Sequence, residues 1–142
     1  MKNPEYRKKL VDKKLKVTPQ RIAILEAIYR LGNHPTAENI IEYIRKHHPN
    51  IATGTVYKSL DTFVSHGLTS RVKTEKDVMR YDAMTDSHHH LYCSDSDRIE
   101  DYIDNELNSV LEDYFMKKNI PGFRIEDLKL QIIGRFTENQ EL

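Results

Sequence analysis

The sequence contains little that could cross-link the chain or anchor it in a membrane. Cys93 is the only cysteine among its 142 residues, which excludes an intrachain disulfide. Any metal site must therefore rest mainly on histidine and carboxylate side chains. No apolar run approaches the roughly 20 residues that a membrane-spanning helix needs, and residues 1–5 lack the apolar stretch of a signal peptide. We expect a cytoplasmic protein with no membrane contact.

The chain also has no net charge, because 22 Lys and Arg residues balance 22 Asp and Glu residues. The two signs are nevertheless separated along the chain. Residues 1–81 contain 16 Lys and Arg against 8 Asp and Glu, a net charge of +8, and residues 82–142 carry the compensating −8. This division favours a basic half that faces a polyanion and a second half with another role. Chance clustering on a solvated surface is the alternative.

The basic half predicts four helices and a hairpin. Apolar residues at helical spacing, Thr18-Pro19 and Thr36 as helix starts, and Gly32-Asn33 as a helix end set the boundaries. The expected helices span residues 4–15, 18–31 and 36–48 and a fourth begins near Thr53, and the expected strands span residues 68–72 and 78–81 around the polar turn 73–77. Three short helices followed by a hairpin is the order of a winged helix-turn-helix.

The second half mixes strands with one helix. The expected strands span residues 88–93, 98–103, 123–125 and 128–134, and the expected helix spans residues 105–119. The turn at residues 94–97 joins the first two strands as a hairpin, and Pro121-Gly122 ends the helix. The whole chain is therefore expected to be an α+β protein.

The predicted fourth helix has the features of a DNA-reading helix. Thr53-Gly54-Thr55 places small polar residues at its first turn, the end that enters the major groove. Tyr57 can pack on a thymine methyl group, and Lys58 can bind phosphate. A basic surface with no nucleic-acid role is the alternative. Further cations that could contact the DNA backbone are Lys13, Lys14, Lys16 and Arg21 near the N-terminus and Arg71, Lys73, Lys76 and Arg80 in the hairpin.

A run of three histidines indicates a metal site. Side chains alternate along a strand, so His88 and His90 point to one face while His89 points to the other. A four-residue turn at 94–97 pairs His90 with Asp101, and Asp82 arrives from the segment between the halves. Nitrogen and oxygen donors together suit iron, manganese or zinc. A solvated histidine run is the alternative. We expect His47, His48 and His66 to be surface residues and Cys93 to be buried as a small apolar side chain.

Six blocks along the chain form a distinctive combination. They are Lys16-Val17-Thr18-Pro19-Gln20-Arg21, His34-Pro35-Thr36-Ala37, Thr53-Gly54-Thr55-Val56-Tyr57-Lys58-Ser59-Leu60, Gly67-Leu68, Arg80-Tyr81-Asp82 and His88-His89-His90-Leu91-Tyr92-Cys93. From Leu15 to Gly134 the chain resembles the ferric uptake regulator (Fur) family. The resemblance implies a winged-helix DNA-binding domain at residues 1–82 and an α/β dimerisation and metal-binding domain at residues 83–142. It also implies a homodimeric repressor on palindromic operators, with the Tyr57 helix in the major groove and Lys16 near the minor groove.

The resemblance also implies a regulatory metal site at His34, Asp82, His88, His90 and Asp101, where one divalent ion, Fe²⁺ or Mn²⁺ or else Zn²⁺, ties the two halves together. Aspartate at position 82 resembles the peroxide-sensing (PerR-like) branch, in which ferrous iron and peroxide oxidise a ligand histidine. The matching positions are His34 and His88. An iron, manganese or zinc uptake regulator without peroxide chemistry is the alternative.

The cysteines depart from the family pattern. Most members hold a structural zinc with two Cys-x-x-Cys pairs, but here Ser96 fills the second position and no cysteine follows Gly134. We expect no four-cysteine zinc site and a dimer that relies on apolar packing of residues 107–115 and 128–133. A further metal site of some members is also expected to be lost, since Ser87, His89 and Leu128 occupy its positions.

Two other functions are compatible with parts of the pattern. His88, His90 and a carboxylate could form the facial triad of a non-haem iron enzyme. Five donors leave little room for a substrate, however, so we expect no enzymatic activity. A metal-independent architectural DNA binder is the second possibility, and it predicts DNA affinity that chelators do not change.

Overall fold

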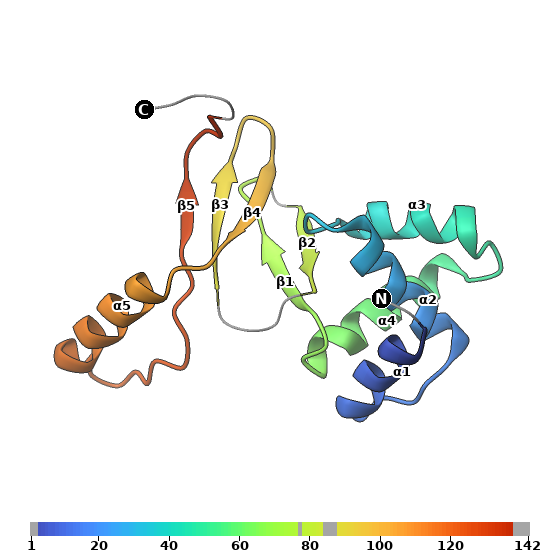
Figure 1. Cartoon of the computed structure of the whole chain (residues 1–142), viewed down its shortest axis with the longest axis horizontal. Helices are drawn as coiled ribbons and strands as arrows, with labels where there is room; N and C mark the ends of the chain where they lie inside the picture. Colours follow the sequence, from blue (N-terminus) through green and yellow to red (C-terminus); the bar gives the residue numbers. More distant parts are fainter. Residues whose placement is uncertain (1–2, 77, 84–87, 138–142) are drawn as a thin grey trace. The chain divides into compact units, whose positions relative to one another are not determined.

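The computed structural model describes residues 3–76, 78–83 and 88–137 of the chain. They fall into two compact units, Met1–Thr85 and Asp86–Leu142, which are considered one at a time (Figure 1). The predicted domain boundary after Asp82 stays a prediction, because residues 84–87 lie outside the described residues. Asp77 of the predicted wing turn and Ser87 of the lost metal site also lie outside them.

The first unit contains four helices and a hairpin, in the predicted order. The elements are α1 (Asn3–Asp12), α2 (Pro19–Leu31), α3 (Ala37–His47), α4 (Thr53–Ser65), β1 (Ser70–Lys73) and β2 (Met79–Asp82). The strands β1 and β2 pair antiparallel, with Ser70 opposite Asp82. The first strand begins two residues later than predicted because the backbone N–H of Leu68 donates to Phe63 O over 2.8 Å and so belongs to the end of α4.

Side-chain caps explain why the helices of this unit begin where the sequence predicts. The Thr18 hydroxyl accepts from the backbone N–H of Arg21 at 3.1 Å, and Pro19 occupies the first turn of α2. Thr36 and Asn39 form a reciprocal capping box at the start of α3. The helices then bury their apolar faces in one core, whose fully buried side chains include Leu10, Ile24, Leu25, Ile40, Leu60 and Phe63.

The second unit is a three-stranded sheet with one helix. Its elements are β3 (His89–Cys93), β4 (Arg98–Tyr102), α5 (Asn105–Lys118) and β5 (Gln131–Ile133). The strand order is β4-β3-β5, with β3 antiparallel to β4 and parallel to β5. The Asp104 carboxylate caps α5 by accepting from the backbone N–H of Leu107 at 3.0 Å.

The strands predicted at residues 123–125 and 128–134 are partly wrong. Residues 123–130 form no strand, and pairing is confined to Gln131–Ile133. The parallel register pairs Gln131–Ile133 with His90, Leu91 and Tyr92 of β3. The expected α+β class, with a winged helix-turn-helix followed by an α/β unit, is nevertheless confirmed.

Apolar side chains are exposed on the second unit. No residue of α5 is buried within the chain. Val110 is 60% exposed, Tyr114 is 54% exposed, and Ile133 of β5 is 57% exposed. Exposed apolar groups in this number are expected where a protein contacts a partner. Among the described residues, no helix has the length and apolar character needed to cross a bilayer.

Candidate metal centre

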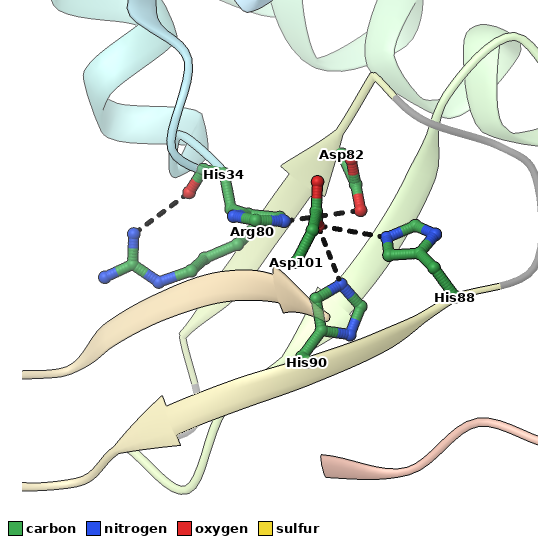
Figure 2. Close-up of polar contacts among 6 residues, drawn as sticks. All are labelled: His34, Arg80, Asp82, His88, His90 and Asp101. Carbon is green, nitrogen blue, oxygen red and sulfur yellow. Dashed lines mark hydrogen bonds and ion pairs between the residues drawn. The ribbon is translucent and has the colours of Figure 1, made fainter. Parts of the chain in front are cut away.

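The first unit supplies an imidazole and a carboxylate that lie against each other. His34 Nε2 is 3.3 Å from Asp82 Oδ2, and the two side chains are only 6% and 5% exposed (Figure 2). His34 comes from the loop between α2 and α3, and Asp82 is the last residue of β2. The loop turns sharply because Gly32, Asn33 and His34 all have positive φ values, 59°, 50° and 57°.

The second unit supplies two imidazoles that converge on one carboxylate. His88 Nε2 and His90 Nε2 lie 3.1 and 3.5 Å from Asp101 Oδ1 (Figure 2). The two rings meet edge to face at 4.7 Å between centroids. His90 pairs directly with Asp101 across the β3–β4 hairpin, which confirms the register that the four-residue turn predicts. Both histidines are buried, and the Asp101 side chain is 32% exposed.

His89 points to the other face of β3, as the alternation predicts. It is 1% exposed, its Nδ1 accepts from the backbone N–H of Leu130 at 3.0 Å, and its Nε2 lies 2.6 Å from Asn108 Oδ1. Since Nδ1 accepts, the proton is on Nε2 and donates to the Asn108 carbonyl oxygen. His89 is therefore a neutral side chain that fastens β3 to α5 and to the start of β5. The sequence offered no sign of these two contacts.

Both sets of donors fit a divalent cation. Each set combines imidazole Nε2 atoms with carboxylate oxygens, the mixed nitrogen and oxygen chemistry that suits iron, manganese or zinc. Asp82 is only 4% exposed, and a carboxylate in such a place requires compensating positive charge or hydrogen bonds. These observations agree with the predicted ligands His34, Asp82, His88, His90 and Asp101, each considered within its own unit.

Cys93 is buried, as predicted, at the end of β3 beside the turn at residues 94–97. Hydrogen bonds from the side chain and the backbone of Ser96 hold the pKa of the Cys93 thiol below its usual value. The serine that replaces the second cysteine of the family pattern thus contacts the first one directly. Among the other histidines, His47 and His66 are exposed as expected, while His48 is half-buried at the end of α3.

The predicted DNA-reading residues lie at the first turns of α4. Thr53, Gly54 and Lys58 are exposed, Thr55 is half-buried and the Tyr57 side chain is 45% exposed. Their contact with bases stays a prediction, and this exposure is compatible with it.

The predicted backbone-binding cations differ in their surroundings. Lys16 is exposed, and the Arg21 guanidinium donates to the Lys16 carbonyl oxygen at 2.9 Å, which fixes the chain just before α2. Lys73 is exposed at the end of β1. These three positions stay predicted DNA contacts.

Two hairpin arginines have contacts that the charge pattern did not reveal. Arg71 forms an ion pair with Asp61 of α4, and its guanidinium lies 5.9 Å from the centre of the Tyr81 ring. A hydrogen bond with Tyr81 and the charge of Asp61 raise the pKa of Arg71 above its usual value. Arg80 is half-buried and donates to the His34 carbonyl oxygen at 3.0 Å. Its contact with DNA phosphate stays a prediction, and unlike the exposed Lys73 this arginine already contacts the metal-site loop.

Comparison with known proteins agrees with this architecture. Residues 12–133 match the Ferric uptake regulator family. Over 120 residues the chain is 31% identical to the peroxide operon regulator of Bacillus subtilis, covering 84% of this chain and 81% of that protein. It is similar in structure to the Campylobacter jejuni peroxide stress regulator, with a TM-score of 0.70 and 25% identity over 99% of this chain and 100% of that one.

A second solved structure shares the fold at lower identity. The ferric uptake regulator of Pseudomonas aeruginosa with manganese matches with a TM-score of 0.76 and 23% identity, covering 94% of this chain and 98% of that one. The family match extends over most of the chain and agrees with the six sequence blocks, the winged helix-turn-helix and the donor sets described above. This chain therefore belongs to the ferric uptake regulator family.

Proposed function

We propose that this chain is a homodimeric, metal-dependent repressor that binds palindromic double-stranded DNA operators in the cytoplasm. The observation that carries the proposal is the presence of imidazole and carboxylate donors in both units, four of them buried, at all five positions expected for the regulatory site: His34, Asp82, His88, His90 and Asp101. The basic first unit supplies the DNA-reading helix α4, and the exposed apolar residues of α5 and β5 supply the dimer contact.

We infer that the two donor sets bind one ion together. Asp82 and His88 are six positions apart in the sequence, so a fully extended chain keeps their Cα atoms within about 20 Å. When bound, a divalent ion supplies the positive charge that neutralises Asp82 and Asp101. His34 and Asp82 then hold the first unit, which binds DNA, while His88, His90 and Asp101 hold the second unit, which forms the dimer. The ligands thereby favour one spacing of the two reading helices in the dimer, and this spacing selects the operator.

The peroxide response is the finer part of the proposal. Aspartate at position 82 resembles the peroxide-sensing branch, and relatives with 27–31% identity are named as peroxide regulators. We propose that hydrogen peroxide, with ferrous iron at the site, oxidises the imidazole of His34 or His88. One peroxide oxygen replaces the hydrogen of a ring C–H bond, and the other leaves as water. The oxidised ring is a poorer ligand, so the repressor releases its operator.

One experiment separates this proposal from its alternative. Operator binding is measured by fluorescence anisotropy with Fe²⁺, Mn²⁺ or Zn²⁺ and with a chelator, before and after peroxide treatment. We expect metal-dependent binding in which only the iron-loaded protein loses affinity, with one oxygen atom added to a peptide containing His34 or His88. A metal requirement without peroxide sensitivity would identify an uptake regulator. Equal binding in chelator would exclude metal-dependent repression.

We also propose that the chain has no tightly held structural zinc and no enzymatic activity. A four-thiolate site is impossible with one cysteine per chain, and the Cys93 thiol is already hydrogen-bonded to Ser96. Metal analysis after exhaustive chelation should therefore find less than one zinc per chain in a protein that remains folded. A retained equimolar zinc would refute this part of the proposal.

A further inference from the structure

Arg80 contacts the same loop that supplies the metal ligand His34. It lies on β2 two residues before Asp82, so the two side chains share one face of the strand. Its guanidinium Nη1 donates to the His34 carbonyl oxygen at 3.0 Å (Figure 2). The ring of His34 meanwhile lies 3.3 Å from Asp82. A single short strand therefore holds His34 at two points, the imidazole and the main-chain carbonyl.

Backbone contacts join the same two segments. The N–H of Tyr81 donates to the Pro35 carbonyl oxygen at 2.9 Å, and Thr36 forms an isolated antiparallel bridge with Arg80. The loop is thus attached to β2 on both sides of Pro35. The contacts of Arg80 and Asp82 with His34 depend on side chains, whereas the contacts of Pro35 and Thr36 with β2 are made by the backbone.

The His34 backbone needs such support. Its φ of 57° is in the left-handed region, which a residue without glycine's freedom rarely occupies, and it directly precedes a proline, which disfavours helical conformations there. A conformation of this kind persists only when its surroundings determine it. The charge-assisted hydrogen bond from Arg80 is a side-chain contact to this peptide group.

We propose that Arg80 is a positioning residue for the metal site, which holds His34 in its strained conformation with the imidazole directed at Asp82. The effect of this role on metal affinity rests on the proposed function. The contacts among Arg80, His34 and Asp82 that define it lie within the first unit. The effect should resemble that of other residues that orient metal ligands, whose loss weakens binding about 10- to 100-fold. Arg80 would then act through His34 and not through DNA phosphate.

The test uses full-length protein and Mn²⁺ alone, titrated calorimetrically into the unaltered chain, Arg80→Met, Arg80→Lys, His34→Ala and the double variant Arg80→Met/His34→Ala. We expect Arg80→Met to bind Mn²⁺ about tenfold more weakly. Arg80→Lys should lose less, because it keeps the charge but not the rigid fork. In the His34→Ala background the same arginine change should have almost no further effect.

Two controls separate positioning from general damage. Arg30→Met removes an exposed arginine of α2 and should leave Mn²⁺ affinity unchanged. In metal-free protein, NMR signals of the His34 ring should shift and broaden in Arg80→Met, which tests the geometry without any ion. If Arg80→Met does not fold, the Mn²⁺ affinity and the His34 ring signals are compared between Arg80→Lys and the unaltered protein.

Equal Mn²⁺ affinity in Arg80→Met and the unaltered protein, or the same loss with and without His34, overturns the proposal. Unchanged His34 ring signals overturn it as well. If the unaltered chain binds no Mn²⁺ while the His34 signals still depend on Arg80, the positioning is upheld and the proposed metal-dependent function fails.

Discussion

Replacement of His90 by alanine removes one of the two imidazoles that face Asp101, and its effect can be calculated from binding linkage. Four donors remain, including the His88–Asp101 pair at 3.1 Å. We take an affinity loss of about 100-fold, the upper end for residues that only orient a ligand. At Mn²⁺ equal to about 100 times the original dissociation constant, the ion stabilises the unaltered fold by about 2.7 kcal/mol, and the variant by about 0.4 kcal/mol.

These free energies predict a clear thermal result. For a chain of this length 1 kcal/mol corresponds to roughly 2–4 °C, so Mn²⁺ should raise the melting temperature of the unaltered protein by about 5–11 °C and that of His90→Ala by about 1–2 °C. Differential scanning calorimetry with and without chelator measures both. His47→Ala, a change to an exposed histidine of α3, is the matched control and should keep the full shift. A full Mn²⁺ shift in His90→Ala, with operator binding still indifferent to chelator, would refute the shared metal site.

Three further results are expected. Asp61→Asn should release Arg71 from its ion pair so that it can bind a DNA phosphate. The slope of the logarithm of the DNA-binding constant against the logarithm of salt concentration, measured by anisotropy, should then steepen by about 0.9 for each protomer. An unchanged slope would count against this contact. Asp104→Ala should lower the midpoint of urea unfolding at pH 7, because it removes the cap of α5. The Leu107 N–H and the Tyr102 hydroxyl lower the pKa of Asp104, so this stability is present above the usual aspartate range and is lost as pH falls through the lowered value; a cost that persists at pH 2 would contradict the cap. Val110→Asp places a charge on the exposed face of α5 and should weaken dimerisation at least about tenfold in sedimentation equilibrium, while leaving the monomer folded.

Local signals in the sequence were sufficient for most of the secondary structure. Thr18 and Thr36 cap helices because each hydroxyl accepts from the backbone N–H three residues later, which the helix itself leaves without an acceptor. The pairing of His90 with Asp101 followed from the length of one turn, since a hairpin with a fixed turn has a fixed register. Such features can be predicted because the residues that determine a helix cap or a hairpin register lie close together in the sequence.

Contacts between distant segments could not be predicted in the same way. The parallel pairing of β5 with β3 joins residues about 40 positions apart, and the amino acids at positions 123–130 do not indicate that this segment forms no strand. The charge of Arg80 predicts affinity for phosphate, but it does not reveal that the guanidinium binds the carbonyl oxygen of a residue 46 positions earlier. His34 entered the candidate site only through the family resemblance, because a single histidine after a turn carries no spacing signal.

Consecutive histidines at β3 contact different groups, because side chains alternate between the two faces of a strand. The even-numbered histidines, His88 and His90, face Asp101, whereas His89 is engaged through both ring nitrogens with Asn108 and Leu130. A displacement of this strand that carried His88 and His90 away from Asp101 would also strain the two hydrogen bonds of His89 on the opposite face. The strand therefore provides a physical connection between the ligand geometry and the packing of α5.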